Sequence, residues 1–192
     1  MKIKIAVFCS GSGSNAEKIF EHFKHHPTIE VALLLANTDK SYALERAKNH
    51  GIPFIVFSKD EFKNGDVLKT LIEHEISWVV LAGFLWLIPQ HLVDYFESKM
   101  INIHPALLPK YGGKGMYGHY VHEEIIKNKE TESGITIHLV NNHYDEGKVL
   151  FQTSCVITPV DTASDVAKKV QLLEHTHFAA TIESTIMTSA KS

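Results

Sequence analysis

The chain has 192 residues, 44% of them hydrophobic and 21% charged, and its 19 basic and 22 acidic side chains give a formal net charge of -3. This length suits one domain, the composition is ordinary for a soluble globular protein, and the slightly negative charge argues against nucleic-acid binding. No apolar run approaches the roughly 20 residues of a membrane span, and the two cysteines, Cys9 and Cys155, fit neither a disulfide framework nor a thiolate metal site. We expect both to be buried, reduced core residues in a cytoplasmic protein that has no membrane or metal partner.

The first hundred residues alternate short apolar runs with segments of helical period. Strands are predicted at residues 3–9, 30–36, 53–57, 78–82 and 100–104. Between them, helices are predicted to start near Ser14 and to cover about 42–50, 66–75 and 90–97, the last with Pro89 as its first residue. This alternation is typical of an α/β fold with a parallel sheet and helices on both faces.

After Pro109 the pattern changes. The glycine-rich segment "KYGGKGMYG" precedes a short helix and two strand-like runs, "SGITIHLV" and "KVLFQTSCVI", which the polar turn "NNHYDEG" joins. We expect these runs to form a hairpin-like pair that closes the sheet. The last helix begins at "DTASD", where Thr162 and Asp165 have the spacing of a capping box.

The stretch "CSGSGSNAEKIF" lies between the first predicted strand and the first predicted helix. Backbone amides and the positive end of a helix can hold an anion at four of its residues, Gly11, Gly13, Ser14 and Asn15. The Gly-x-Gly-x-x-Ala spacing also fits the relaxed dinucleotide fingerprint, but the second strand ends in Asn37 instead of an acidic residue. We favour a terminal phosphate, and a purely structural glycine turn remains the alternative.

A polar pair interrupts the otherwise apolar strand in "MINIHPALLP", because Asn102 and His104 share one face of it. His104 precedes a proline, so it ends the strand at the carboxyl edge of the sheet, where open α/β sheets bind ligands. A carboxylate is needed to orient this imidazole and hold it protonated. The turn "HYDEG" offers Asp145 and Glu146, which the sequence cannot separate. For the pair alone, a structural histidine with a capping asparagine is the alternative.

Two further sets of side chains lie on predicted helices. Glu174 falls on the apolar stripe of the last helix, where a ligand contact and a rim glutamate are equally consistent with the periodicity. The histidine pairs 119/122 and 175/177 lack the pattern of a zinc site, so we expect surface histidines.

Five motifs in this order resemble the phosphoribosylglycinamide formyltransferases, the glycinamide ribonucleotide transformylases of the formyltransferase superfamily: "SGSGSN", "LAGFLWLI", "INIHPALLP", "HYDEG" and "LLEH". The match spans essentially the whole chain. It implies one Rossmann-like formyltransferase domain over residues 1–192, with a phosphate-binding half at 1–100 and a folate-binding and catalytic half at 101–192. The implied reaction moves the formyl group of 10-formyltetrahydrofolate, the co-substrate, to the amine of glycinamide ribonucleotide in purine synthesis, in a monomer or weak homodimer without a metal.

The resemblance also implies a role for individual residues. Asn102, protonated His104 and Asp145 would be catalytic, the first two as donors to the oxyanion and the third in raising the pKa of His104 and in proton transfer. The ribonucleotide would contact Gly13, Ser14, Asn15, Gln171 and Glu174. The folate would contact Leu85, Trp86, Leu87, Ile88 and Asn102 and the segment Val140, Asn141, Asn142 and His143. Trp86 stands where relatives often have a basic residue, so the sequence does not assign the folate tail; Lys63 is a candidate.

Several other functions share parts of this pattern. Methionyl-tRNA formyltransferase and formyltetrahydrofolate hydrolase use the same Asn, His and Asp, but each should carry an additional domain for which we expect no room here. A nicotinamide oxidoreductase or a non-catalytic nucleotide-binding module could be built on the same glycine turn. Binding of NADH compared with binding of a folate analogue separates these classes.

Overall fold

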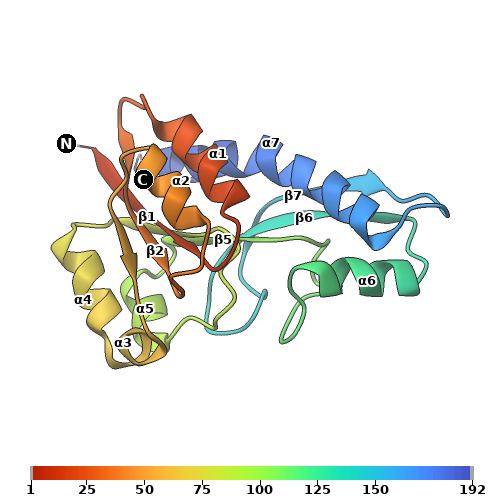
Figure 1. The fold of residues 1–192 in the computed structure, drawn as a ribbon, viewed down its shortest axis with the longest axis horizontal. Coiled ribbons are helices and arrows are strands. Elements are labelled where there is room, and N and C mark those ends of the chain that lie inside the picture. Colours follow the sequence, from red (N-terminus) through yellow and green to blue (C-terminus); the bar gives the residue numbers. More distant parts are fainter. Residues whose placement is uncertain (1, 191–192) are drawn as a thin grey trace. The chain divides into compact units, whose positions relative to one another are not determined.

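The computed structural model describes residues 2–190. In chain order the elements are β1 (Ile3–Cys9), α1 (Ser14–Phe23), β2 (Ile29–Ala36), α2 (Ala43–Asn49), β3 (Phe54–Val56), α3 (Lys59–Asn64), α4 (Asp66–Glu73), β4 (Trp78–Leu81), α5 (Gln90–Tyr95), β5 (Met100–His104), α6 (His119–Lys127), β6 (Glu132–Leu139), β7 (Val149–Val156) and α7 (Ala163–Ser189) (Figure 1). The strands form one seven-stranded sheet in the order β3-β2-β1-β4-β5-β6-β7. The predicted α/β fold with a mostly parallel sheet is confirmed.

The chain divides into two compact units, Met1–Ile101 and Asn102–Ser192, called here the first and second unit. The predicted single domain, with halves at 1–100 and 101–192, stays a prediction.

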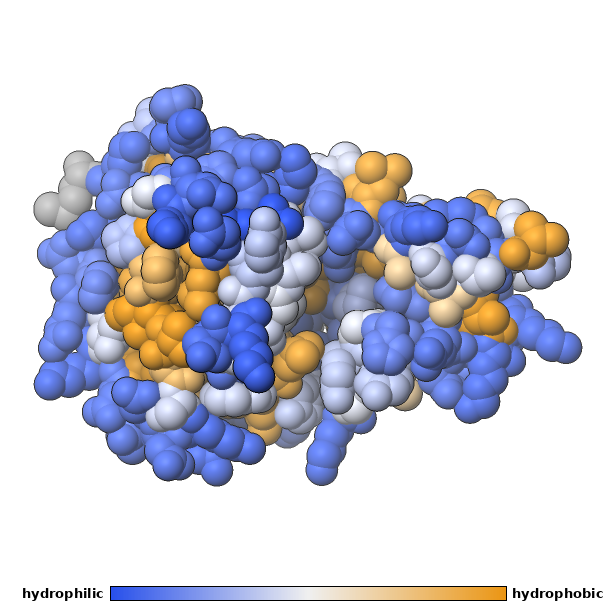
Figure 2. Space-filling view, in the orientation of Figure 1, coloured by the Kyte–Doolittle hydropathy of each residue, from blue (hydrophilic) through white to orange (hydrophobic). Residues whose placement is uncertain are grey.

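In the first unit, β1 lies between two parallel neighbours, β2 and β4. Cys9 pairs with Ala36 at the end of the β1–β2 register, so the loops that follow both strands open at the same edge of the sheet. Residues Ile5 to Cys9 are buried, as expected for a strand covered on both faces. The edge strand β3 carries the exposed Phe54 and Val56, and Figure 2 shows apolar surface where Figure 1 draws this strand.

Two helix predictions in the first unit need correction. The helix α3 was not predicted, although Ser58 and Glu61 form a complete capping box at its start. A Ser-x-x-Glu pattern was therefore available as a signal. Pro89 was predicted as the first residue of α5, but its backbone is extended at φ -61° and ψ 145° and it caps the helix from outside.

In the second unit, β6 and β7 form the predicted antiparallel pair. Their register shifts between Ile137 and His138, and an irregularity of this kind re-aims the next side chain. α7, with 27 residues, packs against β6, β7 and α6 (Figure 1). Its predicted capping box is present, since the Thr162 side chain and the Asp165 backbone and side chain bond reciprocally.

Within residues 2–190, no helix combines the length and the apolar character needed to cross a membrane. No group of three or more potential metal ligands occurs in the same described part of the chain. Both cysteines are free, but only Cys9 is buried; the expectation of a core position is wrong for Cys155, which is half-buried because it lies on the edge strand β7.

Candidate active site

The glycine-rich turn of the first unit leads directly into α1. Gly13 caps this helix in the left-handed conformation, at φ 69°. A Cβ atom on Gly13 would lie 2.6 Å from Cβ of Ala43, so both the backbone angle and the close approach of α2 require glycine. Ser14 is the first residue of α1, and Asn15 is 9% exposed. The three residues predicted to bind phosphate therefore lie together at the positive end of a helix.

The start of α2 holds this turn in place, which the sequence analysis did not foresee. The carbonyl of Gly11 accepts a hydrogen bond of 2.9 Å from the Ser41 hydroxyl. Arg46 donates from Nε to the carbonyl of Ser12 and from a terminal nitrogen to Glu17, both at 2.9 Å. Arg46 is the only arginine in the sequence, and this was the one feature of the sequence that could have pointed to a special role for it.

The segment from Gly83 to Ile88, which contains the predicted folate contacts of the first unit, lies beside the same turn. The Ser10 amide donates to the carbonyl of Gly83 at 3.1 Å, and the Leu85 amide donates to the Ser10 hydroxyl at the same distance. Leu85 and Leu87 are exposed, so they offer apolar surface to a ligand, whereas Ile88 is 8% exposed and belongs mainly to the core.

Trp86 belongs to an aromatic cluster. Its ring centre lies 6.0 Å from Phe57, 5.9 Å from Phe62 and 6.1 Å from Phe84. The ammonium group of Lys59 lies 5.9 Å from the centre of the Trp86 ring, within the range of a cation–π contact. Lys63, the candidate for the folate tail, lies in the last turn of α3, and its role stays a prediction.

In the second unit, His104 and Asp145 lie together at the end of β5. The Nδ1 atom of His104 is 3.5 Å from Oδ2 of Asp145, and its Nε2 atom is 2.7 Å from the carbonyl oxygen of Tyr111. Glu146, the competing carboxylate, is exposed. The geometry therefore favours Asp145 as the partner of His104.

The contact with Tyr111 fixes the neutral form of His104. A carbonyl oxygen can only accept, so Nε2 must donate and carries a proton in every state. The proton that His104 gains or loses is therefore the one on Nδ1, the nitrogen that faces Asp145.

His138 joins Asn102 to this group, and the sequence analysis missed it. Its Nδ1 donates to the carbonyl of Leu139 at 2.8 Å, so Nε2 is the acceptor for the Asn102 amide at 3.1 Å. Nε2 also lies 3.6 Å from Oδ1 of Asp145. Alternation along "SGITIHLV" puts Thr136 and His138 on one face. The same reasoning that identified Asn102 and His104 as a polar pair could therefore have identified His138.

The pKa of His104 departs from the expectation of a protonated side chain. Burial is the largest effect and lowers this pKa, while the Asp145 carboxylate and the Tyr111 carbonyl oppose it and nearby His138 adds to the lowering. The net pKa lies below the ordinary value of 6.5, because the side chain is almost fully withdrawn from water. Asp145 acts to raise the pKa of His104, as expected, but burial lowers this pKa by more, so the net shift is downward.

Asp145 stays ionised in the same surroundings. Burial would raise its pKa, but the imidazolium forms of His138 and His104 and a 2.9 Å hydrogen bond from the Gly113 amide together hold the pKa below its usual value. The residue also has a positive φ of 56°, an uncommon angle for a residue other than glycine.

Other predicted contacts of the second unit are more exposed. On α7, Gln171 is exposed and Glu174 is half-buried, on the same helix as the buried Val166 and Val170. After β6, Val140 and Asn141 are half-buried, and Asn142 and His143 are exposed. The Asn141 side chain accepts from the His143 amide at 3.0 Å, which shapes the turn that leads to Asp145.

The expectation of surface histidines is wrong for His122. This side chain on α6 is 6% exposed, and burial, followed by the charges of His104 and His119, lowers its pKa to about 4. The helix carries Val121, His122 and Ile125 on its buried side, so position and not residue type decided the burial.

The sequence and the structure were compared with known proteins. Residues 3–182 match the family model described as formyl transferase. The chloroplastic phosphoribosylglycinamide formyltransferase of Vigna unguiculata is 41% identical over 186 residues, which are 94% of this chain and 60% of that protein. The chain likewise spans 61% of the Arabidopsis thaliana relative, so it covers about six-tenths of the plant proteins it matches.

Bacterial relatives are closer in length. The Haemophilus influenzae phosphoribosylglycinamide formyltransferase is 33% identical over 90% of this chain and 82% of its own length. The crystal structure of the Bacillus halodurans phosphoribosylglycinamide formyltransferase superposes with a TM-score of 0.86 at 33% identity, over 94% of each chain. The family model covers nearly the whole sequence, and the motifs that carried the resemblance lie within it, so the chain belongs to the formyl transferase family.

Proposed function

We propose that this protein transfers the formyl group of 10-formyltetrahydrofolate to the amine of glycinamide ribonucleotide, giving formylglycinamide ribonucleotide and tetrahydrofolate. Membership of the formyl transferase family and the names of its relatives support this reaction. The observation that carries it is the group Asn102, His104 and Asp145, in which an amide, an imidazole and an ionised carboxylate gather at the end of one strand.

Substrate binding is assigned to both units. Gly13, Ser14 and Asn15 hold the phosphate of the ribonucleotide, where the positive end of α1 favours an anion. Leu85, Trp86 and Leu87 offer an apolar surface for the pterin, with Ile88 as support behind it. In the second unit, Gln171 and Glu174 serve the ribose, and the segment Val140 to His143 serves the folate together with Asn102.

In the reaction, the amine nitrogen attacks the formyl carbon and a new C–N bond forms while the carbonyl oxygen becomes an oxyanion. Asn102 has two amide hydrogens and His138 uses one, so the other can donate to this oxyanion. His104 donates from Nδ1 once that nitrogen is protonated. Developing negative charge on the oxygen favours the imidazolium form, which burial alone disfavours.

Proton transfer completes the exchange. The attacking nitrogen becomes positively charged and must lose a proton, and the leaving nitrogen of the folate must gain one before its bond to carbon breaks. Asp145 is ionised and faces Nδ1 of His104, so it can accept the proton and return it through water. The chemistry needs orientation, an oxyanion donor and a proton carrier, which side chains of this group supply without a covalent nucleophile.

The test is to mix the purified protein with both substrates and to follow tetrahydrofolate by absorbance and the formylated ribonucleotide by mass spectrometry. We expect both products, and a turnover lower by about 10²–10³ for His104→Ala, the typical effect of losing an oxyanion donor. A folded protein that makes neither product contradicts the proposal. Folate release without the ribonucleotide indicates a hydrolase, and NADH binding without folate binding indicates an oxidoreductase.

A cytoplasmic location stays a prediction, since two plant relatives are named as chloroplastic.

A further inference from the structure

One short backbone segment, Tyr111 to Gly113, contacts both members of the His104 and Asp145 pair. The Tyr111 carbonyl accepts from Nε2 of His104 at 2.7 Å, and the Gly113 amide donates to Oδ2 of Asp145 at 2.9 Å. The same oxygen of Asp145 faces Nδ1 of His104 at 3.5 Å. The shape of this segment therefore sets the distance between the two side chains.

The backbone of this segment has an unfavourable conformation, which contacts with other residues must maintain. Tyr111 has a φ of 57°, in the left-handed region that residues with a side chain seldom adopt. At Gly112, a Cβ atom would lie 2.6 Å from the Leu108 side chain and 3.3 Å from Cβ of Asp145, so the backbone passes close to the carboxylate. Tyrosine therefore occupies a position where glycine would be easier, next to a glycine whose replacement would push on the Leu108 and Asp145 side chains.

The tyrosine side chain is anchored through its hydroxyl. Its hydroxyl donates to Oε1 of Glu130 at 2.9 Å, and the ammonium group of Lys110 lies 3.0 Å from the same oxygen. The Glu130 side chain is 24% exposed, and its hydrogen bonds with Lys110 and Tyr111 hold its pKa below the usual value. Glu130 thus remains an ionised acceptor over the pH range in which a histidine titrates.

We propose that the hydrogen bond between Tyr111 and Glu130, called here the clasp, keeps the Tyr111–Gly113 backbone in the shape that positions His104 and Asp145. Neither clasp residue touches the reacting atoms, so both are positioning residues. The proposal rests on the proposed function for its effect on turnover, and on geometry alone for its effect on His104.

Loss of the clasp should change the pKa of His104 in a definite direction. His104 is surrounded by the Asp145 carboxylate, the Tyr111 carbonyl and the side chains of His138 and His122. The carboxylate and the carbonyl raise its pKa, whereas burial and the charge of His138 lower it, and His104 in turn lowers the pKa of His122. If the clasp is lost and the carbonyl moves away, the pKa of His104 must fall further below its ordinary value.

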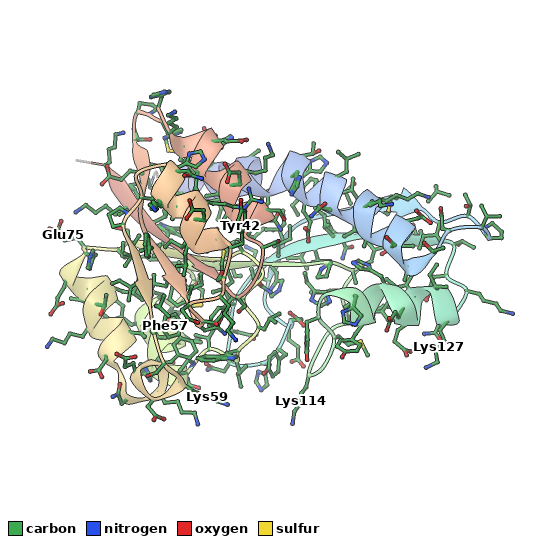
Figure 3. All side chains as sticks on the ribbon, viewed as in Figure 1. Tyr42, Phe57, Lys59, Glu75, Lys114 and Lys127 are labelled. Carbon is green, nitrogen blue, oxygen red and sulfur yellow. The ribbon has the colours of Figure 1, made fainter. Side chains whose placement is uncertain are left out.

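Tyr111→Phe and Glu130→Ala remove the clasp, whereas Glu130→Gln retains an oxygen that can accept from the tyrosine. Glu124→Gln is the matched control, because Glu124 and Lys127 form a similar exposed pair at 2.7 Å on α6, where Figure 3 labels Lys127. The measurements are kcat and KM as functions of pH, and the titration of His104 by NMR in protein with nitrogen-15 histidine. Thermal unfolding of each variant serves as the check on folding.

We expect Tyr111→Phe and Glu130→Ala to lower kcat by about 10- to 100-fold with KM nearly unchanged, the scale of a small misplacement of catalytic groups. The loss of kcat in the double variant should be well below the product of the two single losses, because both single changes remove the bond between Tyr111 and Glu130. The His104 titration should move to lower pH in both, and Glu130→Gln and Glu124→Gln should resemble the original protein.

An unchanged His104 titration in folded Tyr111→Phe and Glu130→Ala overturns the proposal, whatever happens to kcat. So does a loss of kcat that only follows a loss of thermal stability, because that result assigns the clasp a structural role. If the original protein has no formyltransferase activity, the proposed function fails, while the NMR titration still decides whether the clasp acts on His104.

Discussion

His104 has one ring nitrogen bound to a carbonyl and the other facing a carboxylate. The first contact fixes a proton on Nε2, so the second nitrogen alone can change its protonation. Because burial lowers the pKa of His104 and Asp145 raises it, the two effects oppose each other at the nitrogen that faces the reaction. Burial favours the neutral form of His104 in the free protein, and negative charge that develops on the substrate oxygen favours the imidazolium.

Replacement of the carboxylate tests this balance. In Asp145→Asn, the group that raises the pKa of His104 is lost, so the pKa falls further. Activity that needs a proton on Nδ1 is present only below that pKa, and therefore the decline of kcat with rising pH should move to lower pH. A loss of about 10²-fold or more at neutral pH, partly recovered at lower pH, is the expected result from pH profiles of kcat.

The neighbouring carboxylate provides the control for this experiment. Glu146→Gln changes an exposed side chain in the same turn and should leave the pH profile as it was. Equal effects of the two substitutions would contradict the assignment of Asp145.

The sequence predicted the positions of some site residues but not of others. Alternation along a strand predicted that Asn102 and His104 share a face, and it could have predicted His138. The carbonyl of Tyr111 gave no signal, because every residue has the same carbonyl and its direction depends on the backbone angle. His122 was misjudged because spacing between histidines says nothing about which side of a helix is buried.

At the scale of elements, the glycine-rich turn depends on the helix behind it. The start of α2 contacts the turn through Ser41, the close approach of Ala43 to Gly13, and Arg46. Arg46 also joins Glu17 on α1, which is 2.6 Å from His50 at the end of α2. The turn therefore has its shape before any phosphate binds, which lowers the cost of ordering it on binding.

Arg46 allows this arrangement to be tested. Arg46→Ala removes a charged donor to the Ser12 carbonyl and should weaken ribonucleotide binding by about 1–2 kcal/mol, or ~10-fold or more in Kd. Arg46→Lys should not restore binding, because an ammonium group lacks the planar fork that reaches Ser12 and Glu17 together. The measurements are KM, kcat and calorimetric titration with inorganic phosphate.

Lys48→Ala, an exposed change on the same helix, is the control for charge alone. If Arg46→Lys binds phosphate as well as the original protein, net charge and not the shape of the turn explains the role of Arg46.

Elements were predicted best where the hydrophobic period was long. The first five strands and the antiparallel pair β6 and β7 were found, because apolar runs between polar turns are a strong signal. The six-residue α3 was missed because one and a half turns give little periodicity, and only its capping box marked it. For the glycine-rich loop that carries Lys114, labelled in Figure 3, the sequence marked a boundary between elements. It did not predict the backbone conformation of the loop.

At the scale of the whole molecule, β5 belongs to both units. Met100 and Ile101 lie in the first unit, and Asn102 to His104 lie in the second. The seven strands form one sheet, so the unfolding of either unit removes part of a strand on which the other depends. The single domain stays a prediction, and its test is whether the two units unfold together.

Equilibrium unfolding in urea can decide between these possibilities. Both tryptophans, Trp78 and Trp86, lie in the first unit, so their fluorescence reports on that unit. Far-ultraviolet circular dichroism reports on the helices of both units. We expect the two transitions to coincide, as they do for a two-state domain. A second transition, seen by circular dichroism and not by fluorescence, would establish two separately unfolding domains.

A single arginine in the whole sequence makes Arg46 chemically addressable. Its side chain is 27% exposed, so a dicarbonyl reagent selective for guanidinium groups has one target and can reach it. Each molecule can then carry at most one adduct, which a mass spectrum of the intact protein counts directly. The degree to which an added ligand protects Arg46 from modification then measures how much of the protein has ligand bound at the glycine-rich turn.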